Sequence, residues 1–182
     1  MLLEEVATAL NWHVELPFGK FLLAQDSAQV EGHFLVHHVV DSFLQAGEAV
    51  CVVGLARSLS HYTAVSKKMG HNLASAKHKE QFFFVDRLSE SSSLAPWTAA
   101  DLQAIYREFQ ATLTRTDKSI CFVIDDLTML VDLCERRSDV ITFLRYCRTL
   151  CGEKVRYDLQ IVIYRTLNIY RCSSIPYSAS PK

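Results

Sequence analysis

Five short, continuous runs of apolar residues are the feature that most constrains the fold of this chain. They cover residues 20–25, 49–54, 81–85, 119–124 and 159–164. A strand with one solvated face alternates apolar and polar residues, whereas a continuous apolar strand is typical of a parallel sheet covered by helices on both faces. We therefore predict a parallel sheet at the centre of the molecule.

Segments with helical periodicity separate these runs. Their apolar side chains recur three or four positions apart, as on one face of a helix, in residues 34–46, 61–69, 98–113 and 140–151. Gly47 and Gly70 suit the position just beyond a helix end, and Thr98 with Asp101 resembles a capping box. Alternating strands and helices predict a three-layer α/β domain, with ligand sites at the carboxyl ends of the strands.

The overall charge of the chain limits its partners. With 182 residues and a formal net charge of -1, it has the length of one domain and no global field that would attract a polyanion. Any contact with nucleic acid must come from a local patch or from partner subunits. The densest local patch is a lysine-rich segment with candidate RNA contacts at Lys67, Lys68, Lys77 and Lys79, although a solvated helix end is the alternative interpretation.

Neither a membrane nor an oxidising compartment is indicated. The chain begins Met-Leu-Leu-Glu-Glu, without the basic start and apolar run of a signal peptide. No stretch approaches the roughly 18 apolar residues of a membrane span. Its 6 cysteines fit reduced thiols in an intracellular compartment. Cys147 and Cys151 are four apart, but no second ligand pair follows at zinc-site spacing, so we expect no metal there.

The turn after the first apolar run has the spacing of a P-loop, G-x-x-x-x-G-K-[ST]. Ser27 replaces the first glycine, Gly32 keeps the second, His33 replaces the lysine, and Phe34 replaces the hydroxyl residue. Histidine is shorter than lysine and mostly neutral at pH 7, and phenylalanine cannot bind magnesium. Either the turn is a degenerate P-loop or it is an ordinary strand-to-helix connection. Both interpretations argue against tight ATP binding.

The fourth apolar run ends in Asp125 and Asp126, as a Walker B strand does. In a P-loop protein the acid at that position holds hydrated magnesium. Any buried strand can end in an acid, and we favour the interpretation that both aspartates cap the segment that follows. Asp86, after the third run, lies where a RecA-type catalytic base could be. Without a phosphate cradle it would have no substrate.

Three histidines near the start of the first helix suggest a metal site, but weakly. His33 and His37 are four residues apart, His38 is adjacent, and Asp41 could supply a further ligand. Histidines on a helix surface are far more often unliganded. The sequence therefore predicts neither a metal nor any other cofactor. It also lacks a recognisable nucleophile elbow.

Four stretches together resemble the family of Elongator subunit six. They are Gly32 to His38, Leu59 to Tyr62, Val123 to Leu127 and Phe143 to Arg148, and in this order they span roughly residues 15 to 165. The resemblance implies a RecA-like fold without a working P-loop and no enzymatic activity of its own.

It also implies partners. Members of this family pair with the fourth and fifth Elongator subunits in a six-membered ring that binds tRNA. The ring assists the catalytic subunits that modify the wobble uridine, in the cytoplasm and also in the nucleus. Two alternatives stay open from the sequence alone, an active P-loop ATPase and a recombinase-like DNA-binding protein. His33, Phe34 and the neutral charge disfavour them.

The end of the chain departs from the family pattern. We divide the sequence into a RecA-like domain at residues 1–166 and a divergent tail at residues 167–182. Because family members continue for several more strands, we interpret the chain as a shortened form. Missing strands would leave an apolar sheet edge unpaired.

Overall fold

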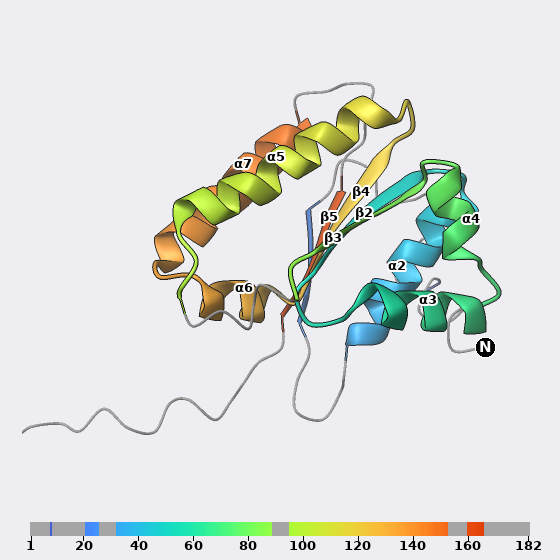
Figure 1. Cartoon of the computed structure of the whole chain (residues 1–182), viewed down its shortest axis with the longest axis horizontal. Helices are drawn as coiled ribbons and strands as arrows, with labels where there is room; N and C mark the ends of the chain where they lie inside the picture. The colour runs from blue at the N-terminus through green and yellow to red at the C-terminus, as the bar shows by residue number, and fades with distance from the viewer. Residues whose placement is uncertain (1–7, 9–20, 26–31, 89–94, 153–159, 166–182) are drawn as a thin grey trace, which may run out of the picture.

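A computed structural model describes residues 8, 21–25, 32–88, 95–152 and 160–165 of the chain. Strands and helices alternate along it, and helices cover both faces of a central sheet (Figure 1). In chain order the elements are β1 (Phe21–Gln25), α2 (His33–Gln45), β2 (Ala49–Gly54), α3 (Leu59–Lys68), α4 (Leu73–His78), β3 (Phe82–Asp86), α5 (Ala99–Arg115), β4 (Ile120–Asp125), α6 (Leu127–Leu133), α7 (Arg137–Gly152) and β5 (Gln160–Arg165).

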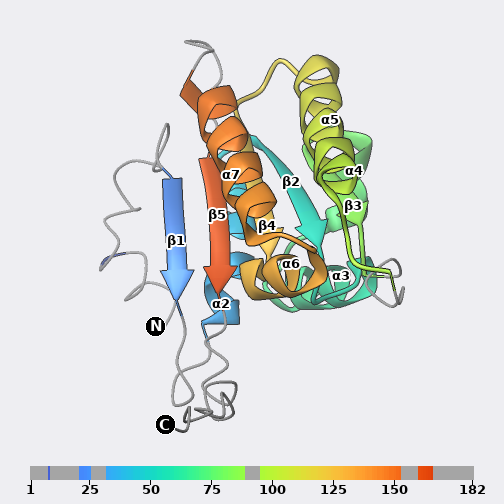
Figure 2. The ribbon, with the colours of Figure 1, turned by 90° about the vertical axis from the view of Figure 1, so that its left-hand side faces the viewer.

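The sheet has five strands in the order β1-β5-β4-β2-β3, and every pair of neighbours is parallel. Each strand lies within about one residue of its predicted run, so the prediction of a parallel sheet is confirmed. Figure 2 shows β1, β5 and β2 pointing the same way, so that their carboxyl ends share one edge of the sheet. Strand β5 separates β1 from β4.

Both faces of the inner strands are buried, which explains their continuous apolar sequence. Successive side chains of a strand point to opposite faces. One face packs against α2, α3 and α4 and includes Val50, Val52, Cys121 and Val123. The other packs against α5, α6 and α7 and includes Cys51, Val53, Phe122 and Ile124. Two apolar cores therefore lie on either side of one sheet.

Strand β1 forms one edge of the described sheet. Its Phe21 and Leu23 side chains are 41% and 53% exposed. The predicted tail at residues 167–182 lies outside the described residues. Within the described part of the chain, no helix has both the length and the apolar character needed to cross a membrane.

The helix ends follow the predicted local chemistry. Gly47 and Gly70 have positive φ angles of 82° and 93° just after α2 and α3. The capping box at Thr98 is confirmed, since the Thr98 N–H donates to Asp101 Oδ2 at 2.7 Å. Two helices, α4 and α6, were not predicted. They have 6 and 7 residues, too few to show a repeated apolar stripe, and each buries one leucine.

Candidate functional site

The candidate site lies at the carboxyl edge of the sheet, where β1, β2 and β4 lead into α2, α3 and α6. Helix α2 begins at His33 directly after Gly32. Helix α3 begins after Ser58, whose hydroxyl accepts a hydrogen bond from the His61 N–H at 3.4 Å. Ser27 lies outside the described residues. Of the four positions predicted for a degenerate P-loop, the structure therefore describes Gly32, His33 and Phe34.

His33 contacts the acid at the end of β4. Its Nε2 lies 3.1 Å from Asp125 Oδ1, and the two side chains are 12% and 0% exposed. The residue at the P-loop lysine position thus pairs with the residue at the Walker B position, across the width of β5. Phe34, at the position of the magnesium-binding hydroxyl, is 39% exposed. In a P-loop protein the side chains at these two positions contact the nucleotide and its magnesium, whereas here His33 and Asp125 contact each other.

Two more histidines complete the cluster. His37 lies one helical turn after His33, and its Nε2 is 3.3 Å from the Nε2 of His61 on α3. The His33 and His37 ring centroids are 5.3 Å apart, and His61 lies 6.0 Å from His33 and 5.2 Å from His37. Behind them the buried Tyr62 ring packs on His37 at 4.9 Å. One imidazole nitrogen from each histidine lies within 4.8 Å of the other two.

Burial and nearby charge shift the pKa of His37, His61 and Tyr62. Burial lowers the pKa of His37 to about 4, and positive charge on His33, His61 and Arg57 acts in the same direction against the opposing Asp125. Burial also lowers the pKa of His61, with help from Arg57. Burial raises the pKa of the Tyr62 hydroxyl, and the charge of Asp125 raises it further. At neutral pH the site therefore presents uncharged imidazole of His37 and an uncharged phenol.

The sequence-predicted histidine cluster is right only in part. His33 and His37 do come together, but Asp41 lies apart from them and binds His71, with Oδ1 2.9 Å from its Nε2. The third member is His61, which sequence reasoning missed. A signal for it was present in the sequence. Strands β1 and β2 are each followed by a helix that carries a histidine near its start, and in a parallel sheet both helices begin at the same edge.

The two acids after β4 have different roles. Asp126 starts α6 with a left-handed backbone (φ 79°), and its Oδ1 accepts hydrogen bonds from the N–H groups of Thr128 and Met129. The predicted cap is thus confirmed for Asp126. For Asp125 it is wrong, because that side chain is fully buried and faces His33 instead. Asp86 lies at the exposed end of β3, where Oδ1 accepts from the Leu88 N–H.

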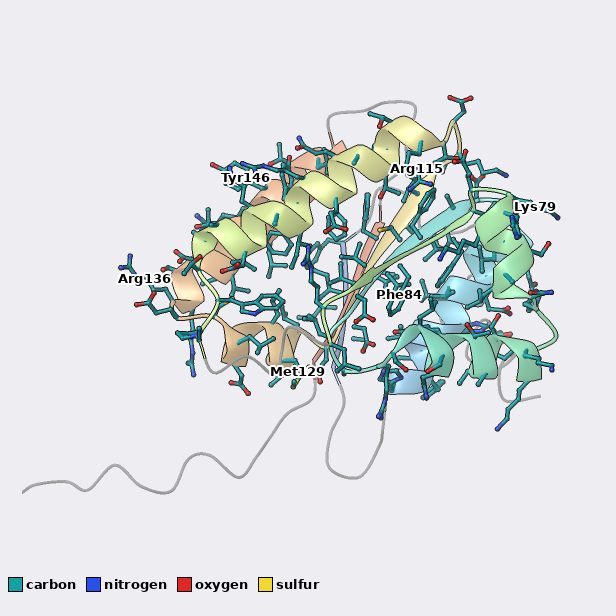
Figure 3. The ribbon with its side chains drawn as sticks, in the orientation of Figure 1. Lys79, Phe84, Arg115, Met129, Arg136 and Tyr146 are labelled. Atoms are coloured by element: carbon teal, nitrogen blue, oxygen red, sulfur yellow. The ribbon has the colours of Figure 1, made fainter. Side chains whose placement is uncertain are left out.

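The four candidate lysines lie away from the histidine cluster. Lys67 and Lys68 end α3, and Lys77 and Lys79 lie at the end of α4. All four are exposed. Lys79 precedes the start of β3 by three residues, which places it near the amino edge of the sheet, at the outer end of α4 in Figure 3. The segment therefore forms a basic flank along α3 and α4 rather than part of the site at the carboxyl edge.

Comparison with known sequences identifies a family. The model of the Elongation complex protein 6 family matches residues 3–168. Elongator complex protein 6 of Xenopus laevis is 36% identical over 158 residues, which cover 76% of this chain and 59% of that protein. The Homo sapiens protein of the same name is 30% identical over 156 residues, covering 74% of this chain and 58% of that protein. The chain thus matches less than two thirds of the length of these relatives.

Solved structures show the same fold at low sequence identity. A KaiC-like protein from Pyrococcus horikoshii superposes with a TM-score of 0.64 at 13% identity, covering 83% of this chain and 64% of that one. The flagellar accessory protein FlaH of Methanocaldococcus jannaschii gives a TM-score of 0.64 at 11% identity, covering 87% and 67%. These similarities show the RecA-like α/β fold predicted from the sequence, and nothing further about activity.

Proposed function

Because the chain belongs to the Elongation complex protein 6 family, we propose that it is a non-catalytic RecA-like subunit of the Elongator complex. In this proposal it lies beside the fourth and fifth subunits in a six-membered ring. The ring binds tRNA and supports modification of the wobble uridine by the catalytic subunits. The family match over residues 3–168 is the observation that carries the proposal.

The geometry at the carboxyl edge supports a subunit that does not hydrolyse ATP. A P-loop needs a lysine on the phosphates and a hydroxyl on magnesium. Here the lysine position holds His33, turned to Asp125 at 3.1 Å, and the hydroxyl position holds Phe34. Neither side chain can make the contacts that ATP and magnesium require. An active ATPase is therefore the weaker candidate, and so is a recombinase-like DNA-binding protein, which would need the same cradle.

Calorimetry and a phosphate-release assay test this part of the proposal. The unmodified chain should bind ATP with no better than millimolar affinity and should not hydrolyse it. Restoring both groups, in the double variant His33→Lys and Phe34→Thr, should be needed before any binding appears. Micromolar ATP affinity in the unmodified chain would contradict a pseudo-ATPase. The single variant His33→Lys is the matched control, because its ammonium would still face Asp125 and would lack a magnesium partner.

Ring assembly is tested by co-purification. RecA-like domains generally associate side by side, and such heterologous contacts close into a ring only when the rotation between subunits allows it. Co-expressed with the fourth and fifth Elongator subunits, the chain should elute with both at the mass of a heteromer. Elution as a monomer while those two subunits associate with each other would count against assembly of this chain.

We propose the basic flank, Lys67, Lys68, Lys77 and Lys79, as the contribution of this subunit to tRNA binding. A chain of net charge -1 should bind RNA poorly by itself, because contacts to phosphates supply most non-specific affinity. In a ring, small patches from several subunits act on one ligand and their weak contacts combine.

The test is reversal of all four charges to glutamate in the assembled ring. The tRNA affinity should fall, and the slope of its dependence on salt should become shallower. Reversal of Arg136 and Arg137, exposed at the start of α7 on the other face of the sheet, is the matched control and should leave both unchanged. An intact ring with unaltered affinity and salt slope after the lysine reversal would assign tRNA binding to the partners.

A further inference from the structure

The structure assigns a divalent transition-metal site to His33, His37 and His61, with zinc as the preferred ion and Asp125 as the group that orients His33. We propose that this ion joins the first turns of α2 and α3 at the carboxyl edge of the sheet. The site differs from the magnesium site of a P-loop protein in its ligands, since imidazole nitrogens replace the hydroxyl and phosphate oxygens. It does not depend on the proposed function.

The spacing of the rings already approaches that of a metal centre. In a tetrahedral zinc site, bonds of about 2.0–2.1 Å place ligand nitrogens about 3.3 Å apart and imidazole centroids about 5 Å apart. The His37 and His61 nitrogens are 3.3 Å apart, and the three centroid distances run from 5.2 to 6.0 Å. With all three ligand atoms within 4.8 Å of one another, no separation must close by more than about 1.5 Å.

The His37 and His61 nitrogens share a hydrogen bond at 3.3 Å, in which one ring donates and the other accepts. A cation would replace that hydrogen bond by accepting a lone pair from each of the three rings. His33 and His37 lie on one helical face because they are four residues apart, the spacing that places paired histidines on zinc in helical sites. His61 reaches the same point from α3. The ligands come from two elements, so the ion would fasten one to the other.

Asp125 lies where it would orient one histidine ligand and balance the charge of the ion. Histidine ligands usually donate their second ring N–H to a carboxylate, which fixes the ring orientation and raises ligand basicity. His33 makes this contact through Nε2, 3.1 Å from Asp125 Oδ1, so it would bind the ion through Nδ1. The Asp125 carboxylate is fully buried, and the buried Tyr62 hydroxyl interacts with it. A nearby cation would offset that buried charge, whereas the positive charge of the exposed Arg57 would oppose a cation.

Imidazole ligands select the class of metal. Nitrogen donors suit zinc, copper, nickel and iron, whereas magnesium and calcium prefer oxygen donors. Three histidines also leave a fourth position to water, as in zinc sites with three protein ligands. All three histidines are partly exposed, which gives an ion access from solvent.

Cobalt(II) titration of the full chain, freed of metal with a chelator, tests the site. We expect one ion per chain with the intense visible absorption of a tetrahedral centre, displaced by zinc. A thiolate-to-cobalt charge-transfer band should be absent, which separates this site from the 6 cysteines. His61→Gln should abolish the visible spectrum, and Asp125→Asn should weaken binding by roughly 10- to 100-fold. The matched control His78→Ala removes an exposed histidine of α4 and should change nothing.

Thermal unfolding supplies a second measurement, which does not depend on the visible absorption of cobalt. Zinc should raise the melting temperature of the unmodified chain and of His78→Ala, and should have no such effect on His61→Gln. Circular dichroism without metal establishes that each variant is folded, and His61→Gln is the primary variant because His61 is only half-buried. The site is overturned if the unmodified chain binds no cobalt in tetrahedral geometry. It is equally overturned if His61→Gln keeps the spectrum or if the ion gives a thiolate band.

Discussion

Replacement of Asp126 should reveal whether this residue is a structural cap or part of a catalytic remnant. The residue has two measurable features, a left-handed backbone (φ 79°) and hydrogen bonds from the N–H groups of Thr128 and Met129 at 2.8 and 3.1 Å. Alanine removes the cap and tolerates the backbone poorly. Glycine removes the cap and relaxes the backbone. Asparagine keeps the hydrogen bonds and also tolerates the left-handed conformation.

The two features predict a specific order of stabilities. Loss of an N-cap to alanine costs about 1 kcal/mol, so Asp126→Ala should lower the free energy of unfolding by at least that amount. Asp126 already carries a Cβ in this left-handed backbone, so only glycine recovers the roughly 1 kcal/mol that the conformation costs. Asp126→Gly loses only a few tenths of a kcal/mol as a cap and should therefore be clearly more stable than Asp126→Ala. Asp126→Asn should be close to the unmodified chain.

Urea unfolding followed by circular dichroism measures these differences, with the slope of free energy against urea compared between variants. An alanine variant within about 0.5 kcal/mol of the unmodified chain would refute a cap contribution. A glycine variant as unstable as alanine would refute the backbone contribution. The first result would leave the Asp126 carboxylate without a structural explanation and would revive the Walker B interpretation.

Three further substitutions test the core and the helix caps by the same assay. Gly54→Ala should cost about 1–3 kcal/mol, because its Cβ would lie 2.3 Å from Phe84 Cζ and 2.8 Å from a backbone oxygen. Phe109→Ala should cost about 3–5 kcal/mol, since this fully buried ring packs 4.2 Å from Phe122. Hydrogen bonds from Thr98 lower the pKa of Asp101 in the fold. Its stabilisation is therefore present above the unfolded pKa and lost as pH falls through the folded one, so Asp101→Asn should destabilise at pH 7 but not in acid.

The sheet could be predicted from the sequence because strands that are buried on both faces consist almost entirely of apolar residues. Cys51 and Val53 pack on one side and Val50 and Val52 on the other, so a buried parallel strand has no polar position to interrupt the run. Helix α5 could also be predicted, since its apolar stripe extends over several turns and begins with a capping box. Helices α4 and α6 could not be predicted, because they are stabilised by hydrogen bonds at their first turns and by one buried leucine each.

The candidate site was harder to predict because it depends on which strand ends meet. His33 and His37 are visible as a pair from their spacing alone, whereas the approach of His61 requires the order of β1, β4 and β2 in the sheet. The same order explains the error over Asp125. A strand that ends in two acids predicts a cap, and only the position of His33 across β5 shows which of the two acids faces inward.

The pairing of His33 with Asp125 bears on the two interpretations of the first turn. An ordinary strand-to-helix connection has no reason to face an acid two strands away, whereas a P-loop protein brings its lysine and Walker B acid to a common ligand. The fold, with one strand between β1 and β4, brings His33 and Asp125 into the same juxtaposition. An imidazole that hydrogen-bonds the carboxylate through one nitrogen keeps its second nitrogen for another contact. The pairing of His33 with Asp125 therefore favours the degenerate P-loop over an ordinary turn as the interpretation of this segment.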